Sequence, residues 1–169
     1  MLDLGYNYRI TDIQCALGIS QLRKLPVWVA RRNEIARRYN DAFSHLQTFT
    51  PLKVRHDLFH AYHLYVIRVD NTDANNNRSA VFKRFRDAGI GVNVHYVPVH
   101  LHPFYRKRFK TGPGDCPVAE NAYECIMSLP IFPGMSDEQV EVLINAVAEE
   151  VSSRQNQHHP GSEQLLCLV

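Results

Sequence analysis

The pattern of apolar and polar positions predicts several amphipathic helices and a few short strands. Thr11 and Gln14 have the spacing of a capping box, so we expect a helix to begin just after Thr11. Pro26 has no N–H to donate and is expected to interrupt that helix and to open a second one, from about Pro26 to Leu46. The apolar stripe of the second helix is formed by Ile35, Tyr39, Phe43 and Leu46.

The middle of the chain predicts a strand, a short helix and a second strand. Residues 62–69 are rich in aromatic and β-branched side chains, which favour a strand. Phe82 and Phe85 have the spacing of one helix face, and Gly89 can end that helix in a left-handed conformation. Residues 91–97 then predict the second strand, so the unit would be of the βαβ type.

The last part of the chain predicts two helices separated by a short extended piece. Residues 98–116 hold three prolines and two glycines and are expected to be irregular. Pro117 can begin a helix, and residues 127–132 are expected to be extended. Residues 136–139 form a second capping box before an apolar stripe of helical period. From Ser152 onward the chain is polar, and we expect a disordered tail.

These elements indicate an α/β fold in three parts. Residues 1–48 hold a signature segment and connecting helices, residues 49–151 a small α/β domain, and residues 152–169 the tail. Of the 169 residues, 45% are hydrophobic and 21% charged, as in soluble globular proteins. A net charge of +2 is too small to indicate nucleic-acid binding. No apolar run reaches about 18 residues and no signal peptide is visible, so we expect no membrane association and a cytoplasmic location.

Two polar segments carry candidate chemistry. Residues 5–9 read Gly-Tyr-Asn-Tyr-Arg, and a guanidinium beside an amide just before a helix can hold a phosphate. A plain polar lead-in to the helix is the alternative. Residues 95–103 hold three histidines, which suit substrate hydrogen bonding, a structural role, or a metal site of His95, His100 and His102. No acidic residue or cysteine beside them completes an obvious ligand set.

Four stretches, in order along the chain, resemble the DegT/DnrJ/EryC1/StrS sugar aminotransferases. They are residues 4–18 with Gln21-Leu22, His63-Leu64-Tyr65, residues 95–100, and residues 116–120 leading to Ser128-Leu129-Pro130. The similarity covers about residues 2–151. Within the family, the sequence of these stretches is most similar to that of transaminases that aminate C4 of a UDP-linked 4-keto-6-deoxy sugar on the way to pseudaminic acid.

The resemblance implies the C-terminal small domain of a fold type I aminotransferase, with long helices followed by a small sheet covered by helices. Such an enzyme is a homodimer that uses pyridoxal 5'-phosphate, with glutamate as amino donor and a UDP-linked keto sugar as acceptor. It implies that Asn7 binds the cofactor phosphate across the dimer. It further implies that Arg9, His95, Tyr96 and His100 contact substrate. No metal is implied.

The chain departs from the family pattern at the lysine that forms the aldimine with the cofactor. In the family that lysine lies upstream of the Gly-Tyr-Asn-Tyr-Arg run, and none of the five lysines here has its context; they are Lys24, Lys53, Lys83, Lys107 and Lys110. A Schiff-base lysine needs a desolvated pocket. We therefore expect no catalytic residue in this chain and no activity from it alone. The alternative is a non-catalytic binding or dimerisation module derived from such an enzyme.

Overall fold

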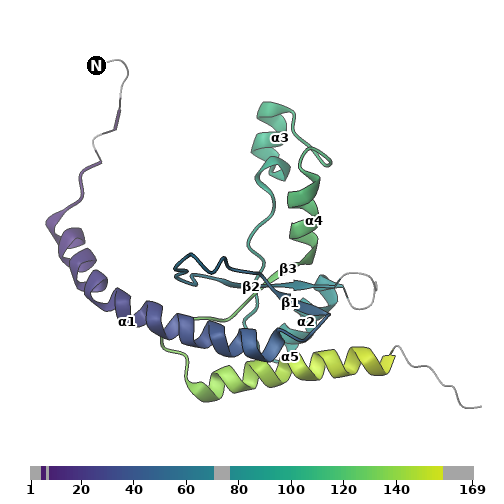
Figure 1. Cartoon of the computed structure of the whole chain (residues 1–169). Helices are drawn as coiled ribbons and strands as arrows, with labels where there is room; N and C mark the ends of the chain where they lie inside the picture. The colour runs from purple at the N-terminus through teal and green to yellow at the C-terminus, as the bar shows by residue number, and fades with distance from the viewer. Residues whose placement is uncertain (1–4, 7, 71–76, 158–169) are drawn as a thin grey trace, which may run out of the picture.

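The computed structural model describes residues 5–6, 8–70 and 77–157. Figure 1 shows helices packed around one small sheet. The elements in chain order are α1 (Asp12–Phe43), β1 (Phe49–Pro51), β2 (Tyr65–Val69), α2 (Arg78–Asp87), the 3₁₀ helix η2 (Val99–Leu101), α3 (Pro103–Phe109), α4 (Pro117–Cys125), β3 (Ile126–Leu129) and α5 (Asp137–Gln157). The strand order is β1-β2-β3, and both pairings are antiparallel. The α/β fold with long helices and a small covered sheet is therefore confirmed.

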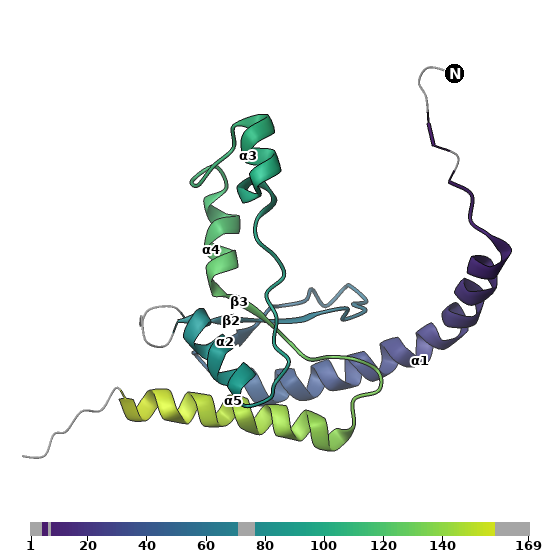
Figure 2. The ribbon, with the colours of Figure 1, turned by 180° about the vertical axis from the view of Figure 1, so that it is seen from behind.

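One face of the sheet carries the core. Directly opposite residues share a face, so the pairs Tyr65–Leu129 and Ile67–Met127 point the same way, and all four side chains are buried. Phe49 on β1 joins them and stacks on Phe85 of α2, with ring centroids 6.2 Å apart. Figures 1 and 2 show α1 and α5 along this side of the sheet and α3 and α4 rising on the other side. The core thus lies between the sheet and helices α1, α2 and α5.

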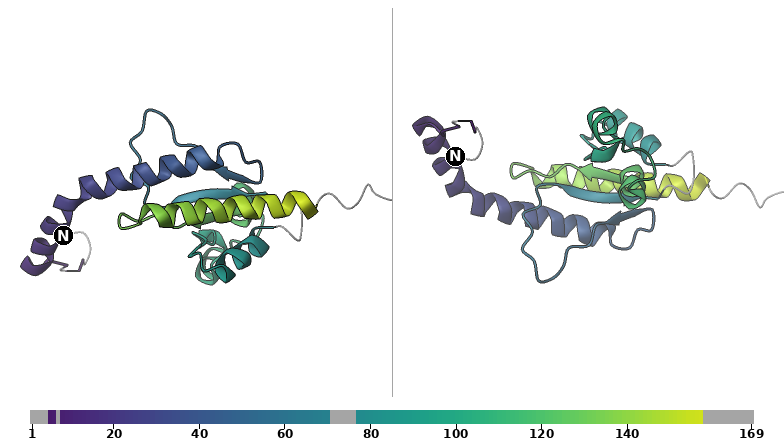
Figure 3. Two further views of the ribbon diagram at one scale, coloured as in Figure 1. Left: turned by 90° about the horizontal axis from the view of Figure 1, so that it is seen from below. Right: turned by 90° about the horizontal axis from the view of Figure 1, so that it is seen from above.

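Helix α1 begins as its sequence predicts. The Gln14 N–H donates to the Thr11 hydroxyl at 3.3 Å, and the Thr11 N–H donates to the Gln14 side chain at 2.9 Å. The predicted break at Pro26 is wrong, because one helix runs through it. A proline inside a helix costs about 3 kcal/mol, and the packing of Ile35, Tyr39 and their neighbours, on the core side, offsets that cost. Figure 3 shows that the N-terminal half of α1 changes direction relative to the rest.

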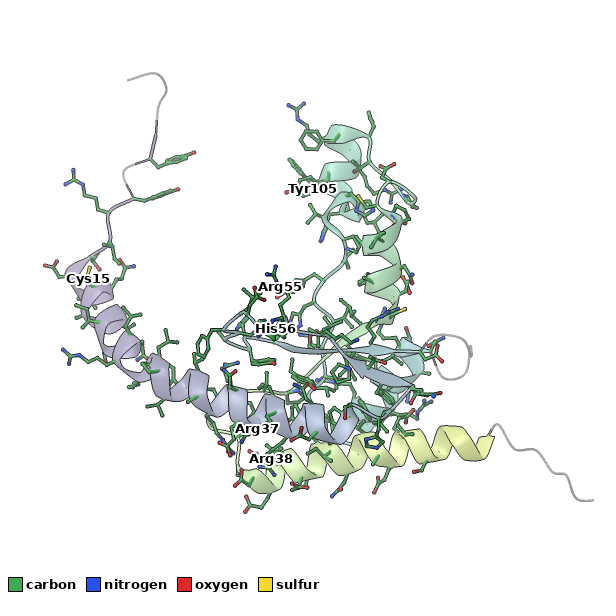
Figure 4. The ribbon with its side chains drawn as sticks, in the orientation of Figure 1. Cys15, Arg37, Arg38, Arg55, His56 and Tyr105 are labelled. Carbon is green, nitrogen blue, oxygen red and sulfur yellow. The ribbon has the colours of Figure 1, made fainter. Side chains whose placement is uncertain are left out.

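Ion pairs join α1 to α5, which lie side by side (Figure 3). Asp137 accepts hydrogen bonds from Arg31 at 2.8 Å and from Arg38 at 2.7 Å, and Arg38 also contacts Glu141 at 2.6 Å. Figure 4 shows Arg38 on the side of α1 that faces α5. The hydrogen bond from Arg31, and then the contacts with Arg38, lower the pKa of Asp137 below its ordinary value. This cluster fixes the start of α5 against the C-terminal half of α1.

The predicted second strand and βαβ unit are wrong. In residues 91–97 only Asn93 pairs with the sheet, in a single antiparallel bridge to Ser128. The Asn93 side chain accepts the Val94 N–H at 2.8 Å, so that N–H is withdrawn from further pairing. The first predicted strand is confirmed from Tyr65 onward, and the short strand β1 was missed.

Two other predictions about irregular segments need correction. Residues 98–116 contain η2 and α3, because Pro103 occupies the first turn of α3, where its missing N–H costs nothing. The prediction of a disordered tail from Ser152 is wrong for residues 152–157, because α5 continues to Gln157. The hydroxyls of Ser152 and Ser153 donate to carbonyls one turn back, at 3.0 and 2.9 Å, so these polar residues remain compatible with a helix. The tail beyond residue 157 lies outside the described residues.

Candidate functional site

A projection that we call the arm contains His100 and directly follows His95 and Tyr96 in the chain. The arm comprises residues 98–125, that is η2, α3, the following loop and α4, and it rises from the sheet in Figure 1. Figure 4 shows Tyr105 on α3 in its upper part. Residues 93–97 lead from the sheet edge into the arm. The arm therefore places the second predicted polar segment at the boundary between the sheet and solvent.

The side chain of His95 is held by a contact with β3, whereas the side chain of Tyr96 is exposed to solvent. The His95 Nδ1 lies 2.9 Å from the hydroxyl of Ser128, which is buried on β3. The Tyr96 side chain is 72% exposed, and its ring meets the His95 ring edge-on at 4.6 Å between centroids. His95 thus uses one ring nitrogen to hold the backbone from which Tyr96 projects.

His100 is held inside the arm and is largely withdrawn from solvent, with a side-chain exposure of 11%. Its Nε2 lies 2.8 Å from Glu120 Oε1 on α4. Glu120 also accepts the backbone N–H of Gly114 at 2.9 Å and that of Cys116 at 3.1 Å. The Gly114 N–H, followed by His100, lowers the pKa of Glu120 below its usual value. The arrangement makes His100 part of the arm's own framework.

The three histidines do not converge on one point. His102 Nε2 lies 3.2 Å from the Val97 carbonyl, while His95 and His100 contact Ser128 and Glu120. No group of three potential metal ligands occurs among the described residues. The metal alternative for His95, His100 and His102 therefore has no geometry to support it.

The described residues that precede α1, residues 5–6 and 8–11, lie to one side of the molecule, away from the arm (Figure 1). Asn7 falls outside the described residues. Tyr6 and Tyr8 stack at 5.2 Å between ring centroids and are 85% and 87% exposed, and Arg9 is exposed as well. Within this chain the structure does not bring Arg9 together with His95, Tyr96 and His100.

The loop between β1 and β2 lines a cavity of about 780 Å³. Tyr62 in this loop has a φ of +45°, in the left-handed region that non-glycine residues seldom adopt. Its N–H donates to His60 Nδ1 at 3.0 Å, and its carbonyl accepts from Arg32 at 2.8 Å. Arg32 also donates to the Ile131 carbonyl at 3.1 Å. The loop is thereby tied to α1 and to the segment that precedes α5.

Sequence reasoning missed the two residues that hold the predicted histidines, Ser128 and Glu120. Both belong to the short motifs on which the family resemblance rests, Cys116–Glu120 and Ser128–Pro130. Those motifs were the available signal. Their contacts with His95 and His100 cross 33 and 20 residues of sequence and follow only from the fold.

Comparison with known proteins decides the family. Residues 1–148 match the family described as the DegT/DnrJ/EryC1/StrS aminotransferase family. The chain belongs to this family. Over 148 residues it is 42% identical to the spore coat polysaccharide biosynthesis protein SpsC of Bacillus subtilis, covering 87% of this chain and 38% of that protein.

Solved structures of the family have the same fold. Helicobacter pylori PseC, an aminotransferase involved in the biosynthesis of pseudoaminic acid, superposes with a TM-score of 0.79 at 30% identity, over 89% of this chain and 40% of PseC. The PMP form of a putative sugar aminotransferase, Spr1654 from Streptococcus pneumoniae, gives 0.81 at 28% identity, over 93% and 39% of the two chains. The chain thus spans about two fifths of the relatives that it matches.

The residues of this family member do not fit a covalently held pyridoxal phosphate. All five lysines lie in described segments, and every one is exposed: Lys24, Lys53, Lys83, Lys107 and Lys110. A lysine that forms a Schiff base with a cofactor needs a desolvated site, which an exposed side chain does not have. None of the helices in the described segments is long and apolar enough to cross a bilayer.

Proposed function

We propose that the chain is the C-terminal portion of a pyridoxal-phosphate-dependent nucleotide-sugar aminotransferase. The complete enzyme transfers an amino group from glutamate to C4 of a UDP-linked 4-keto-6-deoxy sugar, as in pseudaminic acid biosynthesis. The family match over residues 1–148 carries this proposal. The similarity to PseC and SpsC supports its sugar-nucleotide chemistry.

In this proposal the chain supplies surfaces and orientation rather than the reacting amine. Tyr96 projects toward solvent beside the anchored His95, so it can form part of the wall that contacts the substrate. Asn7 and Arg9 serve the cofactor phosphate and substrate of the other subunit in a homodimer. The exposed position of Tyr6, Tyr8 and Arg9, away from the arm, suits a segment that acts on a partner. His100 is predicted to contact substrate, and in the structure Glu120 holds its side chain inside the arm.

The catalytic lysine then belongs to polypeptide outside this chain, and the chain alone is inactive. The exposure of all five lysines supports this part of the proposal. The cofactor, when bound to the full dimer, supplies the electron sink for amino transfer. In this proposal the chain provides part of the wall of the substrate site and the contact between the two subunits.

The decisive experiment starts from the reading frame upstream of Met1. If it encodes a lysine-bearing domain, the joined protein is expected to convert the UDP-linked 4-keto-6-deoxy sugar and glutamate to the 4-amino sugar, followed by mass spectrometry. A matched variant, Tyr96→Phe, keeps the ring and removes the hydroxyl. An upstream frame without such a domain would refute the truncated enzyme.

The alternative is a non-catalytic binding or dimerisation module, and one observation favours it. The N-terminal half of α1 exposes apolar side chains such as Ile13 and Leu17, at 83% and 61%. A joined protein that forms dimers but carries out no amino transfer would support the module. Amino transfer that depends on the upstream lysine would refute it.

A further inference from the structure

The arm has almost no apolar core of its own. Of residues 98–125, all of them described, only Cys125 is buried, while Phe104 and Phe109 remain 68% and 62% exposed. A segment with so few buried apolar contacts opens easily unless specific polar contacts restrain it. The conformation of the arm must therefore depend on its hydrogen bonds.

These hydrogen bonds converge on Glu120. One carboxylate oxygen accepts from His100 at 2.8 Å and from the Cys116 N–H at 3.1 Å, and both oxygens lie 2.9 Å from the Gly114 nitrogen. A carboxylate has about four acceptor positions, so Glu120 is nearly saturated. Through these contacts one side chain joins η2, the loop before α4 and α4 itself.

His100 extends this network toward Tyr96. The Thr111 hydroxyl donates to the His100 carbonyl at 2.7 Å, so residue 100 is held at its side chain and its backbone. The Leu101 N–H donates to the Pro98 carbonyl at 2.9 Å and closes the turn that follows Tyr96. On the other side, His95 is held by Ser128. The short segment that carries Tyr96 is thus fixed at both ends.

We propose that Glu120 is a positioning residue that fixes the arm and, through His100, the direction in which Tyr96 projects. Glu120 is not a catalytic residue, because its carboxylate is occupied by contacts within the arm. That Tyr96 meets a substrate rests on the proposed function. The hold of Glu120 on the arm does not, so the two can fail separately.

Limited trypsin digestion of the chain tests the hold on the arm. Arg106, Lys107, Arg108 and Lys110 are exposed cleavage sites on α3 and just after it. Because Glu120→Ala removes several hydrogen bonds, cleavage there is expected to accelerate at least about tenfold. Glu149→Ala on α5, where Glu149 is likewise exposed, is the matched control and is expected to leave the rate unchanged. The melting temperature of the core reports global folding.

The ring resonances of Tyr96 test the link to the proposed site. They are expected to shift in Glu120→Ala and to stay in place in Glu149→Ala. Glu120→Gln, which keeps an acceptor oxygen and loses the charge, is expected to be intermediate in both measurements and serves if the alanine variant does not fold. Unchanged arm cleavage with a folded core would overturn the proposal. Faster cleavage with unmoved Tyr96 resonances would overturn the role assigned through His100. Absence of amino transfer by a joined enzyme would affect only the proposed function.

Discussion

The two halves of α1 share a helical backbone and have opposite surroundings. Between Asp12 and Leu25, a fully described stretch, no side chain is buried, and Ile13 and Leu17 are mostly exposed. Further along, Ile35 and Tyr39 are fully buried. Most helical stability in proteins comes from packing of an apolar face, and contiguous exposed apolar surface marks an interaction site. The comparison teaches that α1 is anchored at one end and leaves apolar side chains exposed at the other.

The largest expected effect is on folding stability. Phe43→Ala is expected to cost about 3–5 kcal/mol, because it removes a large buried side chain and leaves a cavity. Leu17→Ala in the exposed half is expected to change stability by less than about 0.5 kcal/mol. Urea denaturation of the two variants measures both. Similar losses would show that the exposed half is packed in solution and would break the comparison.

The next effect is on association. The isolated chain is expected to self-associate, because the apolar residues of the N-terminal half of α1 are uncovered. Leu17→Glu places a charge on this surface and is expected to shift sedimentation toward the monomer, with an unchanged melting temperature. The matched control is Val142→Glu, since Val142 is comparably exposed on α5. A wild-type chain that sediments as a single monomer at all concentrations would contradict the predicted self-association.

A smaller effect is expected from pH, and it concerns only the anchored half. Because Arg31 and Arg38 lower the pKa of Asp137 in the folded state, the charged carboxylate stabilises the fold. This contribution is complete above the usual aspartate pKa of about 3.9 and is lost as the pH falls through the lowered value. Asp137→Asn is expected to flatten this part of the acid dependence of the melting temperature. An identical acid profile for the variant and the wild type would remove the ion cluster from the account.

Local signals in the sequence predicted a good part of the fold. Both capping boxes form as expected, the first at Thr11 and Gln14 and the second at Ser136 and Gln139. What the sequence did not reveal depends on tertiary contacts. A helix continues through Pro26 because its far half is packed, and residues 91–97 leave the sheet after Asn93. Propensity and periodicity do not contain this information.

For the candidate site, too, local motifs were predictable and tertiary contacts were not. Its motif residues were recognisable, and Tyr96 is exposed as a contact residue would be. The sequence predicted that His100 contacts substrate, and it gave no sign that Glu120, from another helix, contacts the Nε2 atom of His100. That pairing depends on how α4 packs beside η2, and no local pattern encodes it. Arg9 is exposed and lies apart from the arm within one chain. In the proposed dimer, Arg9 of one subunit would act at the site of the other.

The central proposal is that this chain contributes surfaces to an aminotransferase and that a lysine outside residues 1–169 holds the cofactor covalently. The most direct test is to incubate the purified chain with pyridoxal phosphate, reduce it with borohydride and map the modified peptides. The account predicts partial labelling spread over the exposed lysines, with no visible absorption band of a stable adduct. Complete labelling of one lysine would contradict it.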